Sequence, residues 1–190
     1  MEVLDRRSLR MAVTALALLA CAAPQSQAQG VTAPALKAAF VVNFAKFADW
    51  PEDVVSLGAQ FRFCVLGAPA VAAAVRALVA QQQRKGPGVI VATLAANAAE
   101  DPTELRSCQI LYISGFDRNR MAGVLDSIAG ASILTVSDLD GFARIGGVAE
   151  LYFEDDRMRF AINVESAQRA RLRLGAPLLT LARVVKDARP

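Results

Sequence analysis

The stretch that decides the fold is SDLDGFARIGGVAELYFEDDRMRFAINVESAQRARLRL, residues 137–174. Two runs of alternating apolar and polar residues flank Asp155-Asp156, and we interpret them as the strands of a hairpin with a two-residue turn. In this register one face of the hairpin carries three apolar cross-strand pairs: Ala149 with Ile162, Leu151 with Phe160, and Phe153 with Met158. The pattern therefore predicts an antiparallel pair that buries one face.

The opposite face of the predicted hairpin is polar. Glu154 lies opposite Arg157 and Tyr152 opposite Arg159, with Glu150 next along the first strand. This alternation is typical of a sheet with one face in water. We therefore expect Glu150 on the wet side.

A helix is expected directly after the second strand. Asn163 can cap it with its side-chain oxygen, and Glu165 falls in the first turn, where the helix dipole favours an anion. Glu165 precedes Arg169 by four residues, which is the spacing of a helical ion pair, and Arg173 would share that face.

Strand-like and helix-like segments alternate before the hairpin. We expect strands at 61–67, 89–94, 110–114 and 133–136, and helices at 71–80, from Asp101-Pro102, and at 117–129. Such alternation favours parallel strands joined by right-handed helical crossovers. The predicted fold class is α/β, with three layers, helices on both faces, and a mostly parallel sheet made mixed by the C-terminal β-hairpin.

Two further helices are predicted at the ends of this body. Residues 35–49 have apolar side chains at helical spacing, and Trp50-Pro51 ends that segment. After Gly175 and Pro177 a last amphipathic helix is expected, with the apolar positions Leu178, Leu181, Ala182 and Val185.

The first residues are typical of an export signal. Arginines at 6, 7 and 10 precede an apolar run at 11–23 and a small-residue cleavage site that ends at Ala28. We expect residues 1–28 to be removed as a signal peptide and residues 33–187 to form a single, soluble domain in the periplasm. Two alternatives stay open: lipidation at Cys21, and twin-arginine export through Arg6-Arg7.

Composition argues against nucleic-acid binding. Cleavage would remove three arginines and two acids from the 21 basic and 18 acidic side chains, leaving a net charge near +2. The remaining basic residues form no stripe interleaved with aromatic residues. We expect no nucleic-acid partner.

Catalytic chemistry has little support. The chain has no histidine, which removes the commonest general base and metal ligand. Asp138 and Asp140 could serve as paired carboxylates for acid-base work or for magnesium, but turn residues that bond the local backbone are the interpretation we prefer. Gly146-Gly147 lacks the residues of a phosphate loop and is better explained by a close backbone approach or by a bulge before the hairpin. We expect no enzyme activity, cofactor or metal site.

A binding crevice is expected beyond the carboxyl ends of the strands. In open α/β sheets ligands collect there, and the residues expected at that edge are Ser114, Gly115, Ser137, Asp138 and 141–144. Phe142 and Arg144 are the preferred contacts. The candidate residues for binding a partner or ligand are Ser137, Asp138, Phe142, Arg144, Glu150, Arg159 and Arg169.

Four segments together resemble the YfiR family, which includes HmsC-like proteins. They are LKAAFVVNFAKFADWP at 36–51, FRFCVLG at 61–67, CQILYIS at 108–114, and ILTVSDLDGFARIGG at 133–147 running into FAINVESAQRA. The chain departs from the family in having Gly175-Ala176-Pro177 where members often carry a serine pair, and in lacking a second cysteine pair.

The resemblance implies a function in binding. Such proteins are periplasmic repressors of an inner-membrane diguanylate cyclase, so the chain would dock on the periplasmic domain of that enzyme and lower cyclic di-GMP and biofilm formation. A YfiB-like outer-membrane lipoprotein and a second copy of the chain are further candidate partners. The alternative function is a periplasmic small-ligand receptor that uses the crevice at the strand carboxyl ends.

Cys64 and Cys108 would remain in the mature chain. In an oxidising compartment an even pair suggests a disulfide, although two separately buried thiols would also fit. We favour the bridge because the family resemblance agrees and because the first and third strands are neighbours in common doubly wound orders. Closing so long a loop would stabilise the fold by about 4 kcal/mol.

Overall fold

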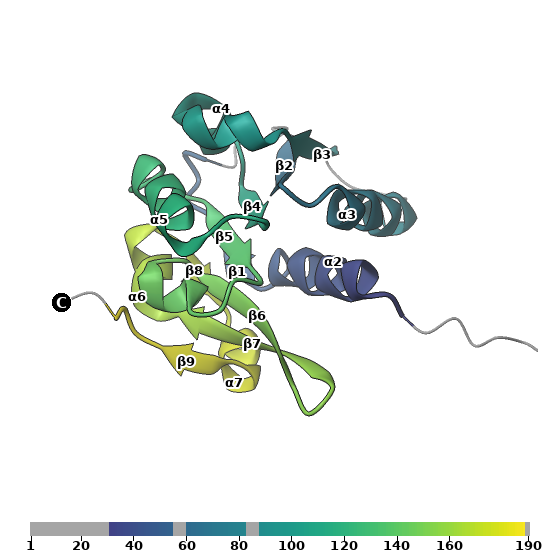
Figure 1. Ribbon diagram of the computed structural model, residues 1–190, viewed down its shortest axis with the longest axis vertical. Coiled ribbons are helices and arrows are strands. Elements are labelled where there is room, and N and C mark those ends of the chain that lie inside the picture. The colour runs from purple at the N-terminus through teal and green to yellow at the C-terminus, as the bar shows by residue number, and fades with distance from the viewer. Residues whose placement is uncertain (1–30, 55–59, 83–87, 189–190) are drawn as a thin grey trace, which may run out of the picture. The chain divides into compact units, whose positions relative to one another are not determined.

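The structure, a computed structural model, describes residues 31–54, 60–82 and 88–188. The predicted signal peptide, with Cys21, lies outside the described residues. Val31–Pro190 make up one compact unit. Among the described residues, a central sheet of seven strands has the order β3-β2-β4-β5-β6-β7-β9 (Figure 1).

The strands of this sheet are β2 (Phe61–Leu66), β3 (Val89–Leu94), β4 (Ile110–Ile113), β5 (Leu134–Ser137), β6 (Ala149–Glu154), β7 (Arg157–Asn163) and β9 (Arg183–Val185). A separate two-stranded sheet joins β1 (Ala48–Asp49) to β8 (Arg173–Leu174). The helices are α2 (Ala33–Phe44), α3 (Pro69–Gln82), α4 (Pro102–Arg106), α5 (Arg118–Ser127), α6 (Val164–Arg169) and α7 (Ala176–Leu181), with 3₁₀ turns η1 (Ala96–Glu100) and η2 (Phe142–Ile145).

The predicted fold class is confirmed. Strand pairs β2–β3, β2–β4, β4–β5, β5–β6 and β7–β9 are parallel, and β6–β7 is antiparallel. The hairpin also has the predicted register, with Leu151 opposite Phe160 and Phe153 opposite Met158. Its turn residues Asp155 and Asp156 both have positive φ, as a two-residue hairpin turn requires.

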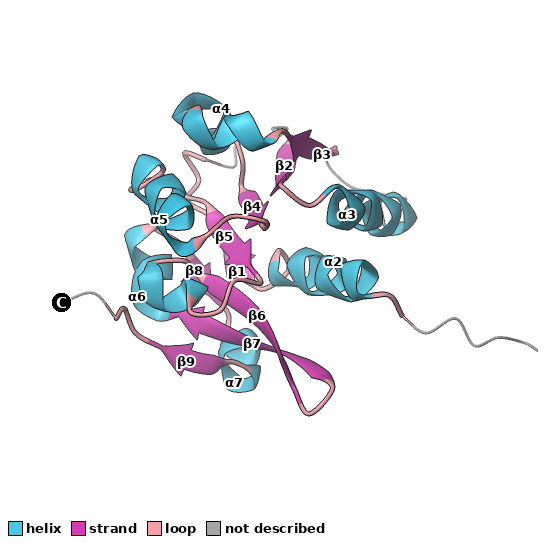
Figure 2. Cartoon of the chain, in the orientation of Figure 1, coloured by secondary structure: helices cyan, strands magenta, loops and turns pink. Residues whose placement is uncertain are grey.

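Helices cover both faces of the sheet (Figure 2). On one face α2 and α3 pack against the apolar sides of the strands, and Phe44, Val75, Tyr112, Leu151 and Ile162 belong to that buried cluster. On the other face η1, α4, α5 and η2 contribute to a second buried cluster, which includes Leu66, Leu105, Leu111, Met121 and Phe142. None of the helices in the described residues is long and apolar enough to cross a membrane.

Local sequence explains where the helices begin. Asp101 accepts hydrogen bonds from the backbone N–H groups of Thr103 and Glu104 at the start of α4, and Pro102 occupies the first helical turn. Asp117 caps α5 in the same way through the N–H of Arg120 at 2.8 Å. The predicted cap at Asn163 is also present, since its Oδ1 accepts from the N–H of Ser166.

Three predicted helical boundaries were wrong. The last helix ends at Leu181, not at Val185, because Arg183–Val185 form β9, which pairs with β7 and is the outer strand of the sheet. The first helix ends at Phe44, and Ala48–Asp49 instead pair with Arg173–Leu174. That pairing also ends α6 at Arg169, so Arg169 and Arg173 do not share a helix face. In each case a backbone ladder to a distant strand competes with helical hydrogen bonds.

Candidate functional site

Asp138, at the carboxyl end of β5, joins two other parts of the fold. Its carboxylate accepts a hydrogen bond from the ammonium of Lys37 on α2, with which it forms an ion pair, and another from the Ser114 hydroxyl at 2.8 Å. The Lys37 and Asp138 side chains are only 21% and 24% exposed. The predicted role of Asp138 as a local turn residue was therefore incomplete, because the carboxylate connects α2 and the end of β4 to the end of β5.

Ionisation in this cluster follows from its surroundings. Burial by itself would raise the pKa of Asp138, but the hydrogen bonds from Lys37 and Ser114 and the charge of Lys37 outweigh burial and lower it. Beneath the ion pair, Tyr112 is fully buried, and burial together with the charge of Asp138 raises the pKa of its phenol. The Asp138 carboxyl is thus ionised at neutral pH while the Tyr112 phenol stays neutral.

The crevice predicted beyond the strand ends is largely filled by side chains. Phe142 and Ser137 are fully buried, so the structure does not support either as a surface contact. The Phe142 ring lies so close to Gly147 that a Cβ on that glycine would be 2.1 Å from the ring carbon Cε1. This is the close approach predicted for Gly146-Gly147. The Ser137 hydroxyl accepts the N–H of Leu139 at 3.1 Å.

Glu150 is inside the protein, and its predicted place on the wet face was wrong. The side chain is 4% exposed, and its carboxylate accepts the N–H of Gly141 at 3.0 Å and that of Ala143 at 3.1 Å. The η2 turn folds over the root of the hairpin and covers what would otherwise be its solvent face. The alternation of apolar and polar residues along β6 does not predict the burial of Glu150, because η2 covers only one end of the strand.

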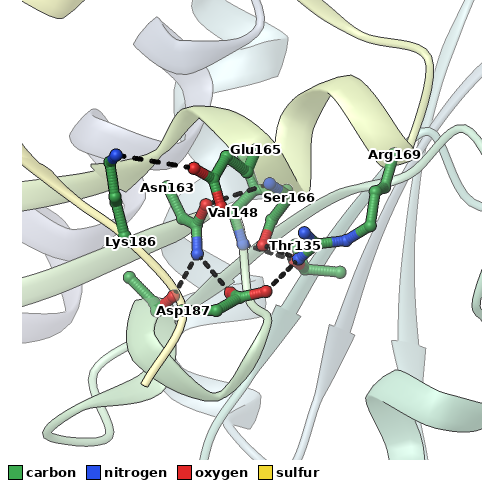
Figure 3. Close-up of polar contacts among 9 residues, drawn as sticks. Thr135, Val148, Asn163, Glu165, Ser166, Arg169, Lys186 and Asp187 are labelled. Carbon is green, nitrogen blue, oxygen red and sulfur yellow. Dashed lines mark hydrogen bonds and ion pairs between the residues drawn. The ribbon is translucent and has the colours of Figure 1, made fainter. Parts of the chain in front are cut away.

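A C-terminal clasp, made by Asn163, Arg169 and Asp187, fastens the end of the chain to the same turn (Figure 3). The Asn163 Nδ2 group donates to Asp187 Oδ1 at 2.6 Å and to the Ala143 carbonyl at 2.7 Å. Arg169 Nη2 lies 2.8 Å from Asp187 Oδ2 and also donates to the Ser166 hydroxyl at 2.7 Å. The clasp holds η2, α6 and the segment after β9 together.

The clasp replaces the helical ion pair predicted between Glu165 and Arg169. Arg169 pairs with Asp187, and Glu165 is 4.0 Å from the ammonium of Lys186. The local sequence does not predict these partners. Lys186 and Asp187 directly follow β9, and they reach α6 only because β9 pairs with β7.

Two predicted site residues besides Arg169 are on the surface. Arg144 is exposed, and its backbone carbonyl accepts the N–H of Ala188 at 2.8 Å. Arg159 is half exposed, and its Nε is 3.8 Å from Glu154 on the neighbouring strand. The structure therefore gathers Arg144, Glu150 and Arg169 around η2 and places Arg159 well along the hairpin.

Two surface hollows have polar walls. The first, of ≈ 240 Å³, lies between the base of the hairpin and the Asp138 cluster, and is lined by Lys37, Asp138, Asp140, Leu151, Tyr152, Phe153 and Met158. The second, of ≈ 470 Å³, lies beside the β1–β8 sheet and is lined by Asp49, Trp50, Pro51, Glu52, Arg171 and Arg173. Sequence reasoning missed the second hollow, since it depends on the pairing of two short strands distant in sequence.

Cys64 and Cys108 form a disulfide in the structure. Both residues are buried, their Cα atoms are 5.8 Å apart, and the bond joins β2 to the residues just before its neighbour β4. The preferred alternative is therefore confirmed.

Comparison with known proteins gives a family. A model of the YfiR/HmsC-like family matches residues 34–183. No curated protein matches the chain.

Two solved structures share the fold. One is the ABC domain in complex with L-Trp from Streptococcus pneumonia, which is 13% identical with a TM-score of 0.50 over 66% of this chain. The other is a conserved domain protein from Vibrio cholerae O1 biovar eltor str. n16961, which is 11% identical with a TM-score of 0.50 over 71% of this chain. The chain spans 55% of the first structure and 57% of the second.

Proposed function

Because the chain belongs to the YfiR/HmsC-like family, we propose that it is a periplasmic regulatory protein that represses an inner-membrane diguanylate cyclase. The observation that carries the proposal is the family match, which extends over residues 34–183 and so includes the hairpin and every strand of the central sheet except most of β9. Repression lowers cyclic di-GMP and with it biofilm formation. The signal-like residues 1–28 and the Cys64–Cys108 disulfide both support export to an oxidising compartment.

Repression by a separate domain has a simple thermodynamic requirement. The regulator must bind the inactive conformation of the cyclase more tightly than the active one, and the ratio of the two affinities sets the degree of repression. A stiff binding surface favours such discrimination, because less conformational entropy is lost on binding. The Lys37–Asp138 pair, the buried Glu150 and the C-terminal clasp each join elements around the hairpin and supply that stiffness.

The proposal is tested by measuring cyclic di-GMP. In a strain that has the cyclase, deletion of this chain is expected to raise cyclic di-GMP and biofilm mass, and expression with an intact signal is expected to restore both. Expression of residues 29–190 without the signal serves as the matched control and should not restore them. Unchanged cyclic di-GMP after deletion would contradict the function, and rescue by the leaderless chain would contradict the periplasmic site of action.

A release step would make the repression reversible. We assign it to a YfiB-like outer-membrane lipoprotein that competes for the regulator. Adding this lipoprotein to a purified complex of regulator and cyclase domain should free the cyclase domain in proportion to its concentration. Formation of a stable ternary complex would rule out simple competition.

A second candidate function is reception of a small ligand, and the hollow beside β1 and β8 favours it. Its lining combines the indole of Trp50 with two arginines and two carboxylates, and Arg171 forms an ion pair with Asp53 at 2.9 Å. A small zwitterion with an apolar part would suit these groups. In a thermal-shift screen with an amino-acid panel, a ligand at a hundred times its dissociation constant should stabilise the protein by about 2.7 kcal/mol. Arg173→Gln should abolish the shift, and a panel without any shift would remove this candidate.

A further inference from the structure

A third hollow, of ≈ 160 Å³, lies between the end of α5, the end of η2 and α6. Small residues leave this space open. The turn after α5 contains Ala129, Gly130 and Ala131, and Gly146 and Ala170 line the hollow from the ends of η2 and α6. Gly130 has a φ of 77°, which glycine adopts without strain, so the turn is built from residues that fill little volume.

Larger apolar side chains form the rest of the inner wall. They are Leu125, Ile128, Ile133, Ile145 and Val148, and all five are buried. An apolar cavity of about 150 Å³ in another protein holds a benzene-sized molecule. The hollow therefore has room for one small ring or a short branched chain.

Two buried hydroxyls give the hollow its polar character. Thr135 and Ser166 both line it and are each 4% exposed. The Thr135 hydroxyl oxygen accepts the N–H of Val148 at 2.9 Å, and that of Ser166 accepts from Arg169 at 2.7 Å (Figure 3). Among the residues that the structure describes, none accepts the hydrogen of either hydroxyl. Because a buried donor without an acceptor is costly, an occupant with an acceptor oxygen is favoured.

The charged side chains of the wall already have partners. Arg169 lies 2.8 Å from Asp187, and Asp126, which is exposed, also has an interaction partner. Arg106 donates to two backbone carbonyls at the end of α5. The other charged side chains on η2, on α6 and directly after β9 are exposed and do not line the hollow: Arg144, Glu165 and Lys186.

This arrangement favours an uncharged occupant. An ion would have to compete with the existing partners of Arg169 or Asp126, and it would lose its hydration on entry. An uncharged oxygen needs only the hydroxyl hydrogens of Thr135 and Ser166.

We infer that the hollow binds a small uncharged molecule that has one ring-sized apolar body and a carbonyl oxygen, such as a cyclic ketone or a lactone. The apolar body fills the space beside Ile128, Ile133 and Val148, and the carbonyl oxygen accepts from the hydroxyls of Thr135 and Ser166. The site is separate from the hollow beside β1 and β8, and it does not depend on the proposed repression of a cyclase.

Three probes of similar size test the chemical class. Cyclohexanone, methylenecyclohexane and cyclohexanecarboxylate are titrated into the purified protein, and binding is followed by the methyl signals in NMR spectra. Cyclohexanone is expected to bind about tenfold more tightly than methylenecyclohexane, which has the same shape without an acceptor, because one hydrogen bond of typical strength gives that ratio. The carboxylate should bind more weakly than the ketone. The methyl signals of Ala131 and Ala170 should shift, and that of Ala77 on α3 should not.

Substitutions test the donors and the location. In the Thr135→Val, Ser166→Ala double variant the ratio of the ketone to the hydrocarbon affinity should fall to about one, whereas Thr135→Ser should keep it near ten. Ala129→Phe places a ring at an exposed position of the wall and should weaken binding of cyclohexanone at least tenfold. Ala77→Phe is the matched control, since Ala77 is exposed on α3, and it should leave the affinity within twofold.

Four results would overturn the inference. Equal affinity of the wild-type protein for ketone and hydrocarbon would show that the hydroxyls do not select an acceptor. Tighter binding of the carboxylate would identify an anion site at Arg169 instead. Full affinity of the Ala129→Phe variant would place the ketone elsewhere on the protein. Unshifted Ala131 and Ala170 signals at millimolar ketone would mean that the hollow holds only water.

Discussion

Lys37 and Asp138, which are 101 residues apart in the sequence, form a partly buried ion pair between α2 and the carboxyl end of β5. Asp138 also accepts from the Ser114 hydroxyl, so the first helix and two neighbouring strand ends meet at one carboxylate. Both residues line the hollow of ≈ 240 Å³ beside the hairpin. Loss of the ion pair should therefore affect both the stability of the fold and the shape of that hollow.

Asp138→Asn should reduce stability at neutral pH by about 2 kcal/mol, the typical value of hydrogen bonds to a charged group. Because the pKa of Asp138 is lower in the folded protein than its usual 3.8, the unfolded state binds more protons as the pH falls. The stabilisation is thus fully present above about pH 4 and is lost as the pH falls through the folded pKa. Urea unfolding at pH 7, 5 and 3 should show that the difference in the free energy of unfolding between wild type and variant decreases at low pH. A difference in unfolding free energy that stays constant with pH would contradict the ion pair.

Glu150→Ala should destabilise the protein by roughly 2 to 4 kcal/mol, because it leaves the buried N–H groups of Gly141 and Ala143 without an acceptor. Glu150→Gln keeps one carbonyl oxygen and should cost less. Glu154→Ala is the matched control, since that side chain is half exposed on the same strand and its ion pair is long. Equal unfolding midpoints for the Glu150→Ala and Glu154→Ala variants would mean that Glu150 does not hold η2.

Local pattern was enough to predict the hairpin, but not what covers it. The pairing of Phe153 with Met158 follows from the two-residue period of apolar side chains, which is visible within the sequence of each strand. The burial of Glu150 depends on η2, which is an irregular turn with no periodicity to detect. The segment of β9 was predicted as part of a helix because Leu178, Leu181 and Val185 have helical spacing, whereas Arg183–Val185 are extended and pair with β7. Tertiary pairing overrides local preference in such short segments.

The candidate site was predicted less well than the fold for a related reason. Strand ends gather binding residues when the crevice between them is open, and the sequence does not say how much of it other side chains occupy. Phe142 fills that space because Gly147 has no side chain, so a residue expected to bind a partner belongs to the core. Phe153, which alternation had assigned to a buried face, is instead 56% exposed. How far α2 covers that face could not be read from the hairpin itself.

Reduction of the Cys64–Cys108 disulfide should lower stability by about 4 kcal/mol, as the chain-entropy model gives for a separation of 44 residues. The bridge is buried, so mild reductant should act slowly on the folded protein and quickly in urea. Intact mass after alkylation, with and without urea, measures both states. Rapid alkylation of folded protein without reductant would show free thiols and contradict the bridge. The Cys64→Ala, Cys108→Ala double variant should be insensitive to reductant.

The substitution Asn163→Asp tests the helix cap made by Asn163 separately from the hydrogen bonds that its amide group donates in the clasp. Asp is as good a helix cap as Asn, so the hydrogen bond from Ser166 N–H to the side-chain oxygen should persist. The lost amide, however, donates to the Ala143 carbonyl and to Asp187, and the new carboxylate would face both acceptors. We expect a loss of about 3 kcal/mol or more, since the oxygen that replaces the amide nitrogen would place a buried negative charge against two acceptors. Hydrogen exchange should become faster in β9 and in the segment after it, while α6 keeps its protection.

A second substitution tests whether the clasp, and not general disruption, causes that loss. Asp187→Asn in the Asn163→Asp background places an amide opposite the new carboxylate, so one hydrogen bond can form again with its direction reversed. Part of the stability and most of the protection at β9 should return, although the Ala143 carbonyl stays without its donor and Arg169 loses its carboxylate partner. Asp187→Asn alone should be destabilising, because it removes the ion pair with Arg169. If the double variant is less stable than Asn163→Asp by the full cost of Asp187→Asn, the two side chains act independently and the clasp does not exist as a unit.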